Sequence, residues 1–148
     1  MTNQSLLPLA LLYADGQRNI EGITRFQKLV FLAQEETDIE KTFEFTPDNY
    51  GPFSTSLYAT LEELEERDVV LRQVETTRGG NKKFIYSIGN LGENAAKALL
   101  KDNTSNFQFI VNEVQPIKEA HNTQPLNQLL RYVYSNYPNT TEESVLDL

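Results

Sequence analysis

The segment from residue 69 to residue 89 most strongly constrains the fold of this 148-residue chain. Residues 69–75 and 83–88 are rich in β-branched and aromatic side chains, and the turn sequence RGGN at residues 78–81 lies between them. Two such runs joined by a glycine-containing turn predict an antiparallel β-hairpin. This hairpin is the clearest structural signal in the sequence, and the patterns on either side of it indicate the fold.

Two helices are predicted in the first part of the chain. Residues 6–14 form an apolar run that ends at an Asp-Gly pair, which is a typical helix stop. In residues 22–36, Thr24 and Gln27 have capping-box spacing, and apolar side chains recur at helical intervals. The apolar face of this second helix is so wide that we expect it to be buried on most sides.

A third helix is predicted directly before the hairpin. Ser54 is its expected N-cap, and three leucines at i, i+4 and i+7 mark its buried side. The opposite side carries Glu62, Glu63 and Glu66. Between the second and third helices, the alternating phenylalanines of residues 43–45 predict a short strand, which is followed by an ordered loop rich in proline and glycine.

Helices are also predicted after the hairpin. One follows it directly, and two more apolar stripes at helical spacing occur in residues 107–117 and 126–134. We therefore divide the chain into a winged helix-turn-helix core at residues 1–102, C-terminal helices at residues 103–138 and a flexible tail at residues 139–148. The C-terminal helices are expected either to pack on the core or to form a dimer interface.

The order of the predicted elements indicates the fold class. The core is predicted as helix, helix, short strand, helix, strand, turn and strand. This order is typical of a winged helix-turn-helix, so the expected fold is α+β and mainly helical, with a C-terminal helical extension. In many small regulators of this kind the third helix enters the major groove of DNA.

Three stretches of the sequence carry a resemblance to a known family. They are RFQKLVFLAQ at residues 25–34, YGPFS at residues 50–54 and LLRYVYSNYP at residues 129–138. With the Leu/Glu-rich helix and the hairpin, they resemble the YwgA-like proteins and the related SocA-like, or Panacea, domains found in many antitoxins. The resemblance covers most of residues 5–138 and implies a small winged-helix regulator. It also implies direct contact with a protein partner, such as a toxin or a regulated protein encoded nearby, and no defined catalytic residues.

The sequence contains no motif for catalysis or for cofactor binding. The chain has no cysteine and only one histidine, His121, so it cannot assemble a zinc site from nitrogen and sulfur ligands. It has no G-x-S-x-G motif and no S-x-x-K with suitable partners. The glycines at residues 79–80 lack the P-loop order and fit a hairpin turn. We therefore expect a protein that is not an enzyme and has no metal or cofactor.

The charge of the chain argues against nucleic acid as its main partner. The 13 basic and 21 acidic residues give a net charge of −8, and the exposed side of the third helix carries several carboxylates that phosphates would repel. The alternative is a DNA-binding transcriptional regulator that uses the hairpin and the start of the third helix. Its candidate residues are Arg25, Lys28, Ser54, Thr55, Ser56, Arg72, Arg78, Lys82 and Lys83. Solubility alone is another explanation for the hairpin cations.

The favoured interpretation is a cytoplasmic, antitoxin-like or adaptor-like regulator that acts through protein–protein contacts. Partly exposed tyrosines are common interface anchors. The candidate partner-binding residues are Tyr50, Tyr58, Glu62 and Glu66. A homodimer is expected through the last helix, with candidate contacts at Leu129, Tyr132, Val133 and Tyr137. The lack of cysteine fits a reducing cytoplasm, and no apolar run is long enough to cross a bilayer.

Overall fold

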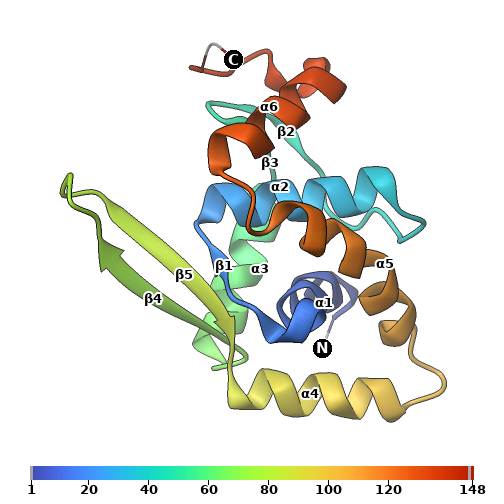
Figure 1. Cartoon of the computed structure of the whole chain (residues 1–148). Coiled ribbons are helices and arrows are strands. Elements are labelled where there is room, and N and C mark those ends of the chain that lie inside the picture. Colours follow the sequence, from blue (N-terminus) through green and yellow to red (C-terminus); the bar gives the residue numbers. More distant parts are fainter. Residues whose placement is uncertain (1, 147) are drawn as a thin grey trace.

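The computed structural model describes residues 2–146 and 148. Within them the chain is 57% helical, with six α-helices and small antiparallel sheets, which confirms the predicted mainly helical α+β class. In chain order the elements are α1 (Asn3–Gln17), β1 (Ile20–Glu21), α2 (Ile23–Glu36), β2 (Thr46–Asp48), β3 (Gly51–Phe53), α3 (Thr55–Glu66), β4 (Val70–Thr76), β5 (Lys82–Ile88), α4 (Asn90–Lys101), α5 (Phe107–His121), α6 (Leu126–Asn136) and the 3₁₀-helix η1 (Pro138–Thr141). Figure 1 shows α1 nearly end-on at the centre, with α2 above it and α4 below it.

Helix α1 forms the apolar centre of the helical body. Eight successive residues in its middle are buried. The helix is interrupted near its end, where Asp15 and Gly16 have φ angles of 55° and 65°, so the predicted Asp-Gly stop lies at the observed break. The ammonium group of Lys118 from α5 closes this end, because its Nζ donates to the carbonyl oxygens of Ala14 and Arg18, each at 2.7 Å.

Helix α2 is buried along residues 25–34, as its wide apolar face predicted. Its start differs from the prediction. The N-cap is Gly22 and no side chain caps the helix, so the predicted capping box of Thr24 and Gln27 is wrong. A capping box needs Ser or Thr at the N-cap position, and Thr24 lies inside the helix. The Gln27 side chain instead reaches the residue before α3, where it pairs with the backbone of Ser54.

The connection between α2 and α3 also differs from the prediction. Residues 43–45 are not a strand. The side chain of Gln34 takes the place of a neighbouring strand, because its Oε1 accepts from the Phe43 N–H at 2.9 Å and its Nε2 donates to the Phe43 carbonyl at 3.0 Å. The strands of this connection, β2 and β3, lie further along the chain and pair antiparallel, with Pro47 opposite Pro52.

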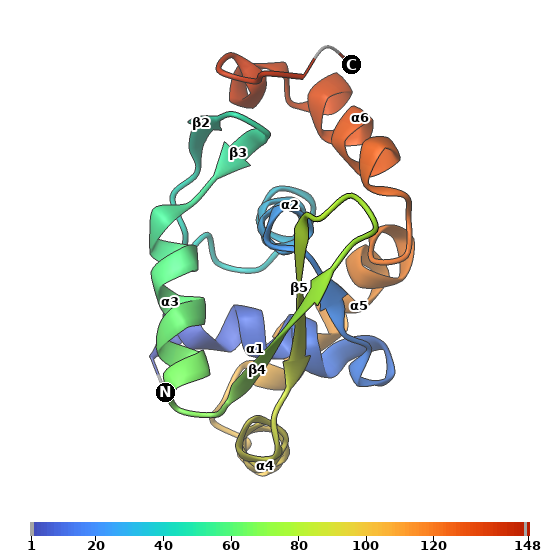
Figure 2. The same ribbon diagram turned by 90° about the vertical axis from the view of Figure 1, so that its left-hand side faces the viewer.

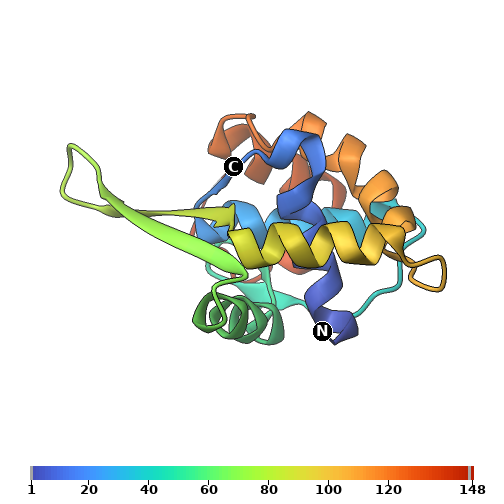
Figure 3. The ribbon, with the colours of Figure 1, turned by 90° about the horizontal axis from the view of Figure 1, so that it is seen from below.

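Strands β4 and β5 form the predicted hairpin, in unbroken antiparallel register over seven residue pairs. Strand β1 was not predicted. It pairs antiparallel with β5, with Ile20 opposite Tyr86, and gives a sheet of order β1-β5-β4. Figures 1 and 3 show that the hairpin projects from the helical body. Residues 70–88 are therefore referred to as the arm.

The C-terminal helices share the core of the N-terminal ones. Helix α5 packs along α1, and its Phe107 and Val114 are fully buried within the same hydrophobic cluster. Helix α6 packs on α2, and α4 on α1 and α5. Figure 2 shows α5 and α6 on one side of the molecule and α3 on the other, with α1 and α2 between them. Residues 1–102 and 103–138 therefore contribute to one core.

The segment at residues 139–148, predicted as a flexible tail, begins within η1 and lies against β2. The Val145 N–H donates to the Asn49 carbonyl at 2.9 Å, and the hydroxyl groups of Tyr134 and Ser144 are hydrogen-bonded. Residue 147 of this segment lies outside the described residues. Across residues 2–146 and 148, none of the helices has the length and apolarity that crossing a membrane requires.

Candidate interaction surface

The predicted partner-binding residues lie along α3 and in the β2–β3 turn. Tyr58, Glu62 and Glu66 are spaced four residues apart on α3, so the helix brings them into one exposed stripe. Tyr50 lies in the β2–β3 turn and is 48% exposed, while Tyr58 is 39% exposed. The rings of Tyr58 and Phe53 of β3 are 6.2 Å apart between centroids, which joins the start of α3 to the neighbouring hairpin. The four predicted residues Tyr50, Tyr58, Glu62 and Glu66 are together referred to as the α3 face.

A buried row of leucines and the hydrogen bonds at its N-terminus fix the orientation of α3. Its three leucines, at residues 57, 61 and 64, are almost fully buried, as the sequence predicted. Ser54 is the N-cap, and its Oγ accepts a hydrogen bond from the Leu57 N–H at 3.1 Å, which confirms the predicted cap. Gln27 holds the backbone of Ser54 on its other side. Helix α3 is therefore anchored to α2 by both its cap and its apolar side.

Two cations predicted for the DNA-binding alternative are inside the protein. Lys28 is 1% exposed, and its Nζ donates to the Pro52 carbonyl at 2.9 Å. Burial lowers the pKa of Lys28 to about 8, although Asp48 opposes this change. Arg25 is 8% exposed, and its Nη1 donates to the His121 carbonyl at 2.8 Å. Neither side chain projects from the surface, so both are withdrawn from the candidate set.

Two cations of the arm are paired with acidic residues of the same chain. The Nε of Arg72 donates to Oε1 of Glu65 in α3 at 3.1 Å. The guanidinium group of Arg72 also lies over the ring of Phe84, 4.7 Å from its centroid. Lys83 forms an ion pair with Glu21 of β1 at 3.1 Å. These contacts attach the arm to the helical body and reduce the positive charge that it offers to a partner.

The other candidates for DNA contact divide into buried and exposed groups. Ser54 caps α3 and is only 1% exposed, so it is also withdrawn from the candidate set. Thr55 is exposed and Ser56 is partly exposed. Arg78 and Lys82 are exposed near the tip of the arm and form no ion pair within residues 2–146 and 148. They are the two cations of the predicted set that the structure leaves available.

The residues predicted for a dimer interface are engaged within the chain. Leu129 and Val133 are fully buried in the core, so they cannot contact a second copy and this part of the prediction is wrong. The hydroxyl groups of Tyr132 and Tyr137 both donate to Oε2 of Glu36 in α2 at 2.7 Å. The hydrogen bond to Glu36 raises the pKa of Tyr132 to about 12, and burial is the main cause of the raised pKa of Tyr137. The apolar stripe of α6 therefore packs on α2.

The structure contains a concave site that the sequence did not indicate. A pocket of about 430 Å³ lies between the arm and the start of α2, and a neighbouring pocket of about 220 Å³ extends towards the β2–β3 turn. Ile23 and Thr24 line both pockets, and Phe84 and Leu126 line the larger one. The lining comes from β1, α2, the arm and α6, so no local sequence motif could have marked it.

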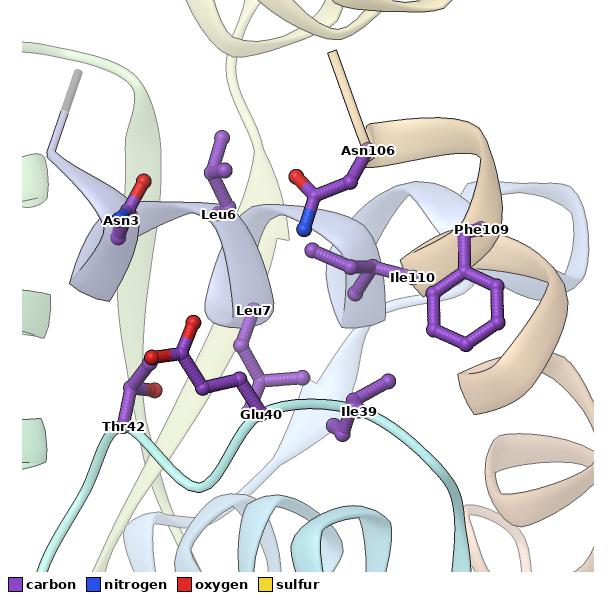
Figure 4. A pocket seen from close by; sticks show the side chains of 9 residues that line it. All are labelled: Asn3, Leu6, Leu7, Ile39, Glu40, Thr42, Asn106, Phe109 and Ile110. Carbon is purple, nitrogen blue, oxygen red and sulfur yellow. The ribbon is translucent and has the colours of Figure 1, made fainter.

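A third, smaller pocket lies away from the α3 face. Figure 4 shows its lining side chains, which come from the start of α1, the loop after α2 and the start of α5. Leu7, Ile39 and Ile110 supply apolar surface, and its volume is about 60 Å³. The Thr42 hydroxyl, which also lines it, is buried without a hydrogen-bond partner among the described residues. None of the predicted site residues lines this pocket.

Comparisons with known proteins add no assignment to this surface. No family model matches the chain, and no curated protein matches it. In the part of the chain that the structure describes, no three His, Asp or Glu side chains converge as metal ligands would.

Proposed function

We propose that this protein is a non-catalytic winged-helix regulator that acts by binding another protein, as its resemblance to YwgA-like and SocA-like (Panacea) antitoxin-type domains implies. The order of α1, α2 and α3 followed by the β4–β5 hairpin supports a winged helix. The pairing of β1 with β5 supports it further, because it attaches the hairpin to the helices as a wing. In this assignment α3 occupies the place of a recognition helix, and the arm is the wing.

The main support for a protein partner is that the cations needed for a nucleic acid are largely engaged. Arg25 and Lys28 are buried, while Arg72 and Lys83 are paired with glutamates. The stripe on α3 presents two carboxylates and a half-exposed tyrosine instead. Phosphates would be repelled by these carboxylates, whereas a protein with basic and apolar groups would find complementary contacts. The proposed partner therefore carries a basic surface, and the family resemblance implies that it is encoded close to this protein.

Co-purification tests the proposed partner. The full-length protein, carrying an affinity tag, is co-expressed with the product of each adjacent gene in turn. We expect one product to be retained, and the double change Glu62→Lys with Glu66→Lys to reduce its retention about tenfold. The matched control is Glu119→Lys, which reverses an exposed acid on α5 and is expected to leave retention unchanged. Equal retention by the wild type and the double variant would contradict the assignment of the α3 face.

A gel-shift series tests the DNA-binding alternative, which the free cations Arg78 and Lys82 favour. Fragments from the protein's own locus are titrated at low and at rising salt. We expect at most weak binding that does not depend on sequence. Tight, salt-sensitive binding to one fragment, lost on Arg78→Ala with Lys82→Ala, would overturn the proposal and establish the alternative.

A further inference from the structure

The outer side of β4 is an unpaired sheet edge. Strand β4 is the last strand of the sheet, and six of its seven residues are exposed. At the ends of the hairpin, the Thr77 N–H donates to the Asn81 carbonyl and the Gly89 N–H donates to the Val69 carbonyl. These two bonds fix the alternation of the antiparallel ladder, in which every second residue of β4 exchanges its backbone hydrogen bonds with β5. The remaining residues of β4 direct their backbone groups outward.

The outward backbone groups belong to three residues in the projecting part of β4. From the alternation of the ladder they are Arg72, Val74 and Thr76, and each has one N–H and one C=O on the outer edge. None of these groups has a hydrogen-bond partner within the described part of the chain. The projection of the arm, which Figures 1 and 3 show, leaves this edge accessible from outside.

Strand β4 lacks the features by which proteins usually protect such an edge. Common protections are a proline, a bulge or outward lysines. The sequence VLRQVET contains neither proline nor lysine, and its pairing with β5 has no bulge. Its single cation, Arg72, is held by Glu65. In addition, Leu71 and Val74 are 44% and 51% exposed. An unprotected edge with exposed apolar side chains is suited to pairing with another strand.

The two ends of the arm carry opposite charges. At the tip, Arg78 and Lys82 are exposed cations. At the base, Glu66 and Asp68 are exposed acids where α3 leads into β4, and the exposed Arg67 between them leaves a net negative charge there. None of these residues forms an ion pair within residues 2–146 and 148. When two identical arms lie side by side and antiparallel, the cationic tip of each lies beside the acidic base of the other.

We propose that β4 pairs with β4 of a second copy of this chain, antiparallel and about a two-fold axis at Val74. The two three-stranded sheets then form one continuous sheet across the dimer. In this arrangement the outward groups of Val74 bond to those of Val74 in the second copy, and those of Arg72 bond to those of Thr76. The proposal goes beyond the proposed function, because it concerns the protein alone and needs no partner protein.

Side-chain pairing selects this register over its neighbours. Residues that face each other directly across antiparallel strands have side chains in contact. With the axis at Val74, the two valines meet, each beside its own Phe84 on the same face of the sheet. A shift that places the axis at Gln73 would set Leu71 against Glu75, and a further shift would set Arg72 against Arg72. Of these three registers, the one centred on Val74 alone sets apolar against apolar groups at the axis and separates like charges.

Sedimentation equilibrium of the full chain, from micromolar to millimolar concentration, provides the first test. We expect a monomer–dimer equilibrium for the wild type. Val74→Lys places two like charges at the axis and is expected to weaken dimerisation about a hundredfold. The control Phe109→Lys changes another exposed apolar residue, on α5, and is expected to leave dimerisation unchanged. The proposal would be overturned if the wild type stayed monomeric, or if the two variants weakened dimerisation equally.

A charge exchange tests the contact between tip and base. Arg78→Glu and Glu66→Lys should each weaken the homodimer about tenfold, since each brings like charges together at both ends of the interface. A mixture of the two variants should form a heterodimer with the affinity of the wild type, because each altered charge then meets its opposite. If the mixture dimerised no more tightly than each variant does alone, this contact would be excluded.

Cysteine cross-linking tests the register, because the chain has no cysteine of its own. In the proposed register Gln73 faces Glu75 of the second copy as a non-hydrogen-bonded pair, with Cα atoms about 4.5 Å apart, a separation that a disulfide can span. A mixture of Gln73→Cys and Glu75→Cys should therefore form a disulfide-linked heterodimer on mild oxidation. Rapid cross-linking of Gln73→Cys alone would show that the axis lies at Gln73 and would overturn the proposed register.

Discussion

The side-chain amide of Gln27 pairs with the backbone of Ser54 in both directions. Its Oε1 accepts from the Ser54 N–H at 2.8 Å, and its Nε2 donates to the Ser54 carbonyl at 3.0 Å. Gln34, two turns later on α2, pairs with Phe43 in the same manner. Both glutamine side chains are buried. Helix α2 thus supplies the hydrogen bonds that a neighbouring strand would otherwise give to the segment leading into α3.

Removing the amide of Gln27 tests this anchoring of α3. We expect Gln27→Ala to lower the free energy of unfolding by about 2–3 kcal/mol, because it leaves the buried N–H of Ser54 without a partner. It also removes one of the two hydrogen bonds that the Ser54 carbonyl accepts, the other being from the Tyr58 N–H. The matched control is Gln128→Ala on the exposed side of α6, for which we expect a change below about 0.5 kcal/mol. Urea titration of both variants measures the difference, and equal stabilities would contradict the role of Gln27.

Stability should depend on pH because two lysines are buried. Burial lowers the pKa of both Lys28 and Lys118 to about 8, below their ordinary value of 10.5. Between about pH 8 and 10 the unfolded chain therefore binds more protons than the folded chain, so stability rises with pH. Each lysine is expected to contribute about 2 kcal/mol across this window. Urea titrations at several pH values measure the rise, and Lys28→Met is expected to remove about half of it.

Tyrosines reverse this trend at higher pH. Burial raises the pKa of Tyr86 to about 12, so above about pH 10 tyrosine ionises in the unfolded chain before the folded one. The folded chain then binds more protons, and stability falls with pH. The titrations should therefore show a maximum near pH 10. A flat profile between pH 8 and 10 would show that the two lysines keep ordinary pKa values in the folded protein.

The last helix gives a prediction that separates core residues from interface residues. Leu129 is fully buried in the core, whereas Leu126 of the same helix is 40% exposed. We expect Leu129→Ala to lower the free energy of unfolding by about 2–5 kcal/mol, and Leu126→Ala to have a much smaller effect. Neither change should alter the oligomeric state measured by sedimentation, since the last helix packs on its own chain. A loss of dimer without loss of stability in Leu129→Ala would restore the interface predicted from the sequence.

Strong periodic signals made part of the fold predictable. The leucine stripe of α3, its Ser54 cap and the arm all appear where the pattern placed them. Strand β1 was missed because it has only two residues, and two residues carry no periodicity. The alternating phenylalanines of residues 43–45 suggested a strand, but Gln34 satisfies the backbone of Phe43 from another element. A long-range side-chain contact of that kind leaves no local signature.

The candidate site was less predictable because charge does not reveal burial. Arg25 and Lys28 were candidates for contact with DNA, yet both reach backbone carbonyls inside the protein. Their carbonyl partners come from α5 and β3, which are remote in sequence. Tyr58, Glu62 and Glu66 of the α3 face are exposed, because helical spacing from the leucine stripe fixes their direction.

A close approach between α4 and the base of the arm gives the sharpest prediction. A Cβ atom on Gly92 would lie 2.3 Å from the backbone oxygen of Val69 and 2.9 Å from Cγ1 of Ile88, distances that no folded chain tolerates without movement. In the solvent-exposed interior of a helix, a Gly→Ala substitution adds about 1 kcal/mol of stability. Here the clash is with backbone, so we expect Gly92→Ala to lower stability by about 2 kcal/mol or more.

The matched control for Gly92 is Gly79→Ala at the tip of the arm. A Cβ atom there would meet only the Asn81 side chain, at 3.9 Å, and we expect a change below about 0.5 kcal/mol. Urea titration compares the two variants. Because Val69 directly precedes β4, the displacement caused by Gly92→Ala must also move the arm, so hydrogen exchange in β4 and β5 should increase more than in α2. Unchanged stability in Gly92→Ala would show that α4 does not approach Val69 as closely as described.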